Sequence, residues 1–174
     1  MKVIFLDIDG VLNASDTKSK APSGCTGISE ALLKRLRKII EATGARVVLS
    51  STWKTEIDER IRAVTPDGKY MINKFLYKGK FLLFDKTPDA KSSWHRGTEI
   101  AMWLNNHENI EEFVILDDIY FDDFDKFDLT SHFVNTDPIV GLTDDNVEDA
   151  IAILNGKRMV PIDECETILG IGVT

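Results

Sequence analysis

The sequence predicts an α/β fold with a mostly parallel β-sheet, because short apolar runs alternate along the chain with segments of helical periodicity. Three of these apolar runs end in polar residues, Asp7, Ser50 and Asp117, as strands do when their ends line a ligand site. A length of 174 residues suits one hydrophobic core, so we expect a single domain over residues 1–174.

The first half of the chain is expected to hold two strands and two helices. Val3–Asp7 is a continuous apolar run that ends in a carboxylate, which is typical of a buried strand. A helix with apolar residues three and four apart is predicted over about Ser29–Ala42, with Gly44 as its stop. Arg46–Leu49 is the second predicted strand, and a short helix is expected over about Thr55–Val64.

The middle of the chain carries a segment without a clear period. Pro66-Asp67-Gly68 is interpreted as a turn, and it opens an insert at about 66–95 that we expect to be irregular or a small hairpin. Regular elements then resume. We expect a helix at Gly97–His107, strands at Phe113–Leu116 and His132–Asn135, and a helix from Thr143 to about Leu154.

Charge is unevenly distributed along the chain. The 21 Lys and Arg against 29 Asp and Glu give a net charge of −8, which excludes a nucleic-acid binder that works through global positive charge. Residues 69–96 nevertheless hold seven basic residues against two acidic ones, whereas residues 109–149 hold 13 acidic residues. Basic groups interleaved with aromatic rings suit single-stranded nucleic acid. The alternative for this insert is a hydrophobic hairpin with a solvated lysine face.

Composition excludes several other classes of protein. The two cysteines, Cys25 and Cys165, lack the spacing of metal ligands, which argues against a zinc site and a disulfide scaffold. No apolar run approaches the ~18 residues of a membrane span. We therefore expect a cytoplasmic protein with no membrane partner and no obligate protein partner.

Carboxylates at the ends of buried strands indicate a cation-dependent site. A charge next to a core is costly unless it is paired or bound to a metal. In parallel sheets, ligands bind in the crevice beyond the carboxyl ends of the strands, where Asp7 and Asp117 are placed. Mg²⁺ takes oxygen ligands and commonly sits between carboxylates and a phosphate, so it is the expected cofactor.

These residues form a set of motifs. Asp7-Ile8-Asp9-Gly10-Val11-Leu12-Asn13 resembles the first motif of the haloacid dehalogenase-like (HAD) phosphohydrolases, Ser50 the second, and Asp117-Asp118 the fourth. The strings DGVLN, LSSTWK, TEIAMWL, ILDD and GLT are similar to the HAD domains of Swiss-Army-knife RNA-repair proteins. They are more distantly similar to the phosphatase domains of polynucleotide kinase-phosphatases. The resemblance implies a Rossmann-like three-layer sandwich with a minimal cap.

The resemblance also implies a phosphatase that works through an aspartyl-phosphate. Asp7 is then the nucleophile, and Asp9 is the general acid and base. Mg²⁺ is expected to be held by Asp7, the backbone carbonyl of Asp9 and Asp117, with Asp118 completing the metal shell through water.

The phosphoryl oxygens are expected to be bound by a second group of residues. The resemblance implies Ser50 and the backbone N–H of Ser51 for this role, with Gly10 beside the substrate. The basic residue of the third motif is expected just ahead of the helix that starts at about residue 97. Arg96 is the favoured candidate because a guanidinium binds phosphate bidentately, and Lys91 is the rival.

Each motif also has an ordinary structural interpretation. Asp7 and Asp9 would then form a turn, and Ser50 would cap the following helix. Asp117 and Asp118 would belong to a solvated acidic loop, in which Asp122 is a further acid of interest. The tryptophans, including Trp53, are interpreted as packing residues.

The spacing of the motifs bears on the substrate. Only 41 positions separate Asp9 from Ser50, and 46 separate Ser50 from Arg96, so the chain has no room for a helical cap domain. An open pocket favours a bulky phosphorylated substrate, and terminal phosphates of nucleic acids or nucleotides are the preferred hypothesis. The alternatives are small phosphometabolites, phosphoproteins, or a non-catalytic phosphate-binding module. The second carboxylate, Asp9, argues against the last of these.

Overall fold

A computed structural model describes residues 1–90 and 95–157 of the chain. Its centre is a five-stranded, all-parallel sheet with the strand order β3-β2-β1-β4-β5. The strands are β1 (Lys2–Leu6), β2 (Arg46–Leu49), β3 (Leu83–Lys86), β4 (Glu112–Asp117) and β5 (Phe133–Asn135). The α/β fold with a parallel, Rossmann-like sheet is therefore confirmed.

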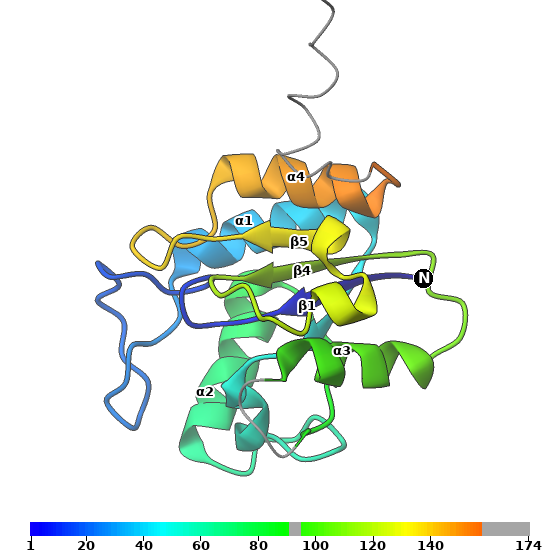
Figure 1. Cartoon of the computed structure of the whole chain (residues 1–174). Coiled ribbons are helices and arrows are strands. Elements are labelled where there is room, and N and C mark those ends of the chain that lie inside the picture. The colour runs from blue at the N-terminus through cyan, green and yellow to red at the C-terminus, as the bar shows by residue number, and fades with distance from the viewer. Residues whose placement is uncertain (91–94, 158–174) are drawn as a thin grey trace, which may run out of the picture.

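Helices cover both faces of this sheet. Figure 1 shows α1 (Glu30–Thr43) and α4 (Asp144–Leu154) on one side and α3 (Arg96–Asn105) on the other. α1 ends where Gly44 adopts a positive φ of 68°, and its N–H closes the last turn on Ile40. α4 begins with a capping box between Thr143 and Asn146.

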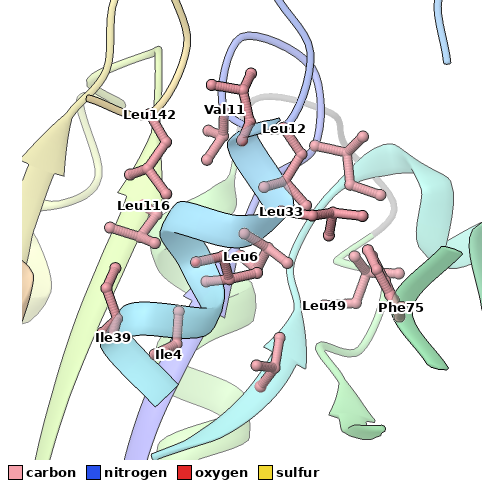
Figure 2. Close-up of a cluster of buried hydrophobic side chains, with 14 of the residues drawn as sticks. Ile4, Leu6, Val11, Leu12, Leu33, Ile39, Leu49, Phe75, Leu116 and Leu142 are labelled. Carbon is pink, nitrogen blue, oxygen red and sulfur yellow. The ribbon is translucent and has the colours of Figure 1, made fainter. Parts of the chain in front are cut away.

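The alternation of side chains along the strands divides the core into two layers. Ile4 and Leu6 of β1 face the layer that holds α1 and α4, where Ile39 and Leu33 of α1 lie near them (Figure 2). Val3 and Phe5 face the opposite layer, where α3 packs. Because residues 3–6 are buried on both faces, the strand reads as a continuous apolar run.

The prediction of a short helix over Thr55–Val64 is wrong. The chain forms only the 3₁₀ turn η1 (Thr52–Glu56) there, and an isolated bridge between Ile57 and Ala63 then closes a loop. Asp58 explains the difference, because its carboxylate accepts the backbone N–H groups of Arg60 and Arg62 at 2.8 and 2.9 Å. Such local hydrogen bonds compete with those of a helix.

The prediction of a turn at Pro66-Asp67-Gly68 is also wrong, because these residues begin the helix α2 (Pro66–Asn73). Thr65 caps this helix by accepting the N–H of Gly68, and Pro66 occupies the first helical position, which suits its fixed φ. The π-helical turn η2 (Lys74–Gly79) and the edge strand β3 follow. From residue 66 to residue 86 the insert thus forms a helix and adds a strand to the sheet, rather than forming an irregular or hairpin segment.

Several aromatic and basic residues of the insert are used within the fold. Phe75 and Phe81 are buried and stack with their ring centroids 4.9 Å apart. The Tyr70 hydroxyl accepts the N–H of Ile28, and Lys74 pairs with Glu30. None of the helices in the described part of the chain has the length and apolar character that crossing a membrane requires.

Candidate active site

Three carboxylates converge at the carboxyl-terminal edge of the sheet. Asp7 follows β1, whereas Asp117 and Asp118 lie at the end of β4, and one carboxylate oxygen of each lies within 4.8 Å of the others. β1 and β4 are neighbours at the point where the strand order reverses, because the chain adds β2 and β3 on one side and β5 on the other. This is where open α/β sheets bind their ligands.

Arg96, the first residue of α3, reaches this cluster from the face of the sheet opposite α1 and α4. Its Nη2 lies 3.2 Å from Asp7 Oδ1, and its Nε lies 3.5 Å from Asp117 Oδ2. The guanidinium also lies over the ring of Phe121, 5.3 Å from the ring centroid. Of the two basic residues expected near the site, Arg96 lies beside the carboxylates, and Lys91 falls outside the described residues.

The electrostatics of the cluster are those of a cation site. Burial and the charge of Asp117 raise the pKa of Asp7 to about 8, although Arg96 opposes the shift. Burial raises the pKa of Asp117 to about 6 and also raises that of Asp118. One guanidinium therefore faces three carboxylates that resist ionisation together, and Asp117 Oδ2 is buried without a hydrogen bond. This donor set fits a hard divalent cation such as Mg²⁺.

Ser50 and Ser51, which follow β2, are both buried beside the cluster. The Ser50 N–H donates to Leu6 O at 2.9 Å, which continues the β1–β2 ladder by one residue. Its hydroxyl, in contrast, has no hydrogen-bond partner. The Ser51 hydroxyl forms a hydrogen bond to Asp7, which opposes the rise in the pKa of that carboxyl, and accepts the N–H of Trp53 at 3.4 Å.

Asp9 is exposed, yet two side chains hold its carboxylate. Asn13 Nδ2 donates to one oxygen at 2.7 Å, and the indole N–H of Trp53 donates to the other at 3.0 Å. Trp53 is buried, as its interpretation as a packing residue requires, but its contact with Asp9 was missed. A pattern of apolar residues carries no signal for that contact. Asn13 lies within the first motif, and this position was the available signal for its part in the site.

Gly10 allows the first motif and Asp118 to approach each other. It has a φ of +76°, and a Cβ at this position would lie 2.4 Å from Asp118 Cγ. Its N–H donates a hydrogen bond to Asn13 Oδ1 at 3.0 Å, and its carbonyl accepts one from the hydroxyl of Thr136 at 2.8 Å. The structure thus gives Gly10 a packing function, and its contact with substrate stays a prediction.

The acidic segment after Asp118 divides into surface and buried residues. Asp122, the further acid of interest, is exposed. Asp123 is buried instead and accepts hydrogen bonds from the first turn of α3. Sequence reasoning missed Asp123, because a run of alternating acidic and aromatic residues does not show which carboxylate turns inward.

A cavity of about 320 Å³ opens directly beside Asp9. Its lining consists of Asp9, Thr52, Trp53, Thr55, Glu56, Asp67 and the exposed Cys25. The cavity therefore lies next to the carboxylate expected to act as acid and base.

Comparison with known proteins gives a family match. No curated protein and no solved structure matches the chain significantly. A family model described as the HAD domain in Swiss Army Knife RNA repair proteins matches residues 3–147, which include the strand-end carboxylates, Ser50 and Arg96. The chain therefore belongs to this family of HAD domains.

Proposed function

We propose that the protein is a Mg²⁺-dependent phosphatase that hydrolyses phosphate monoesters through an aspartyl-phosphate on Asp7. One observation carries this proposal. Among the described residues, the buried side-chain atoms without a hydrogen-bond partner are Ser50 Oγ, Arg96 Nη1 and Asp117 Oδ2. Buried polar atoms nearly always form hydrogen bonds, so three that form none in a single site indicate that a ligand completes them. A phosphoryl group suits the two donors, and a cation suits the carboxylate.

The roles follow from the chemistry of each group. An Asp7 oxygen forms a bond to phosphorus while the bond between phosphorus and the leaving oxygen breaks, and Asp9 donates a proton to that oxygen. Asp9 then takes a proton from the water that hydrolyses the aspartyl-phosphate. Bound Mg²⁺, held by Asp7, Asp117, Asp118 and the Asp9 carbonyl, would supply Lewis-acid neutralisation of the phosphoryl charge.

The surroundings of Asp9 favour turnover over simple phosphate binding. A phosphate-binding module needs donors, and a carboxylate near the phosphoryl site would repel the ligand. Here Asn13 and Trp53 hold the Asp9 carboxylate, and the cavity for a leaving group opens beside it. Proton transfer explains why a second carboxylate is fixed at this position.

For the substrate, we propose terminal phosphates of nucleic acids or nucleotides. Two observations support this choice. The description of the family model names RNA repair proteins, and the cavity beside Asp9, with a volume of about 320 Å³, is large enough for a nucleoside. Phe75 and Phe81 of the insert are buried and give this choice no support, whereas Tyr77 and Phe84 of the insert are exposed. Small phosphometabolites and phosphoproteins are the competing classes, and we propose the cytoplasm as the location.

Hydrolysis of an aryl phosphate tests the proposed activity. We expect turnover by the wild-type protein with Mg²⁺ and none with a chelator. Asp7→Asn should lose activity by about 10³-fold or more, because the amide cannot act as the nucleophile. Asp122→Asn is the matched control, since Asp122 is exposed and lies outside the carboxylate cluster. Equal rates for Asp7→Asn and the wild type would exclude the mechanism.

A substrate panel then tests the proposed class. The panel compares 3′-phosphorylated and 5′-phosphorylated RNA oligonucleotides, nucleoside monophosphates, a sugar phosphate and a phosphoserine peptide. We expect the highest kcat/KM for one of the nucleic-acid or nucleotide substrates. A sugar phosphate or a phosphopeptide that exceeds all of them would overturn the substrate proposal and leave the phosphatase proposal intact.

A further inference from the structure

The first turn of α3, which carries Arg96, is held by a residue outside the helix. The N-cap residue His95 makes no side-chain capping bond. Asp123 supplies the cap instead, because its carboxylate accepts the N–H groups of Gly97 at 3.0 Å and Thr98 at 2.7 Å, and the Thr98 hydroxyl at 3.0 Å. A Cβ at Gly97 would lie 2.7 Å from the same carboxylate, so the approach requires glycine.

A buried ion pair holds the same turn from the side of the phosphate-binding serines. Lys54 Nζ lies 2.7 Å from Glu99 Oε2, and the two side chains are only 10% and 9% exposed. Lys54 Nζ also donates to Pro88 O at 2.9 Å, and Glu99 Oε1 accepts the N–H of Ala90 at 3.2 Å. The pair therefore joins η1, α3 and the segment that follows β3.

The position of this pair along the chain is informative. Lys54 follows Ser50 by four residues, within the 3₁₀ turn that begins directly after Ser51. Glu99 follows Arg96 by three residues, which places both side chains on the same side of α3. The ion pair thus fixes one end of the phosphate-binding segment to the turn that carries the guanidinium.

Stability alone is a weak reason for such a pair. Removing two charges from water costs several kcal/mol per ion, and buried pairs are often replaced by apolar residues without loss of stability. Catalytic groups, in contrast, must be held within fractions of an ångström, and a misplacement of about 1 Å can cost about 10²-fold in rate. A pair that links the two phosphate-binding elements meets this requirement.

We propose that Lys54 and Glu99 are positioning residues that set the Arg96 guanidinium against the phosphoryl site, and that Asp123 fixes the same turn from its N-terminal end. The inference rests on the proposed phosphatase function. None of the three residues contacts the reacting atoms, so each acts through Arg96. Their removal should therefore matter only while Arg96 is present.

A double-mutant cycle between Glu99 and Arg96 tests the proposal. We expect Glu99→Gln to lower kcat for an aryl phosphate about tenfold and to weaken the binding of inorganic phosphate about threefold, since the guanidinium contacts the phosphoryl group in the ground state and more strongly in the transition state. In the Arg96→Ala background, the same substitution should change kcat less than about twofold. The affinity for inorganic phosphate with Mg²⁺ is measured in parallel, and it reports on any variant without measurable turnover.

Three further variants separate positioning from stability. Lys54→Met should reproduce the effect of Glu99→Gln, and Lys54→Arg, which keeps the charge, should restore most of the rate. Ile100→Val, a buried residue of the same helix, is the matched control and should lower the melting temperature without changing kcat. If Glu99→Gln fails to fold, Asp123→Asn takes its place in the cycle.

Two outcomes would overturn the proposal. One is an equal loss of kcat or phosphate affinity from Glu99→Gln with and without Arg96. The other is a Glu99→Gln variant with wild-type kcat and phosphate affinity. A wild-type protein that hydrolyses no phosphate monoester would contradict the proposed function instead, and its phosphate affinity would still decide whether Glu99 acts through Arg96.

Discussion

At the scale of single residues, the site depends on two glycines, against which carboxylates pack at positions that a Cβ would otherwise occupy. Gly10 and Gly97 each leave room for a carboxylate, Asp118 and Asp123 respectively. In both cases a Cβ would meet carboxylate atoms at under 3 Å. These glycines therefore determine where the acidic groups lie, in addition to allowing backbone turns.

Gly10→Ala should weaken metal binding as well as the fold. The new Cβ collides with Asp118, and a positive φ is strained for alanine, so we expect a loss of about 1–3 kcal/mol in the free energy of unfolding. Titration with Mg²⁺ should show lower affinity. Gly44→Ala is the control, because it has a similar φ of 68° and open space around it; it should lose stability and keep its Mg²⁺ affinity. Equal Mg²⁺ affinities for both variants would contradict this account.

The structure brings together the carboxylates that the sequence places at strand ends. Asp7 and Asp117 follow buried apolar runs, and the geometry of parallel strands brings such ends together. Trp53 and Asp123 were not predicted as parts of the site, because each contacts a segment distant in sequence through one polar group. Their surroundings in sequence match those of an ordinary packing residue and an ordinary surface acid.

At the scale of elements, four of the five described strands and three of the four described α-helices follow from apolar periodicity, whereas the segment from residue 52 to residue 86, which holds α2 and β3, does not. Pro66-Asp67-Gly68 has the composition of a turn, but it also suits the start of a helix when a threonine precedes it. The choice was decided by Thr65, whose hydroxyl caps α2, and by Met71, which is buried against the core. β3 has no fully buried residue, and it forms because β2 offers a free edge.

Thr65→Ala should destabilise the protein through α2. The hydroxyl accepts the N–H of Gly68 and donates to Glu56, so its removal leaves a helix N-terminus uncapped. We expect a loss of about 1 kcal/mol in the free energy of unfolding by urea, and Thr65→Ser should restore most of it. A Thr65→Ala variant as stable as the wild type would show that α2 does not depend on this cap.

At the scale of the whole molecule, a cluster of buried acids makes stability depend on pH and on cations. Folding raises the pKa of Asp7 to about 8 and that of Asp117 to about 6, so the folded protein binds more protons than the unfolded chain above about pH 4. The stability linked to these groups is complete below the unfolded pKa and is lost as pH rises through 6 and then 8. Acids at the surface with lowered pKa values, such as the half-buried Asp58 at about 2, have finished titrating in this range.

We therefore expect the melting temperature in a chelator to fall between pH 5 and pH 8.5. Asp7→Asn should flatten this slope, whereas Asp122→Asn should leave it unchanged. Mg²⁺ should raise the melting temperature more at pH 8.5 than at pH 5, because it binds the ionised carboxylates. A metal-free protein that gains stability over this range, equally with and without the Asp7 carboxyl, would contradict the electrostatic description of the site.

The most direct test of the account is the phosphoenzyme itself. Asp9→Asn should still form an aspartyl-phosphate from an aryl phosphate with a good leaving group, because that group needs no proton, but should hydrolyse it slowly. We predict a burst of one equivalent of the phenol leaving group per protein and a mass gain of one phosphoryl group on the peptide that carries Asp7. Slow hydrolysis with neither burst nor adduct, as direct attack of water on phosphorus would give, or an adduct on another residue, would contradict the central claim.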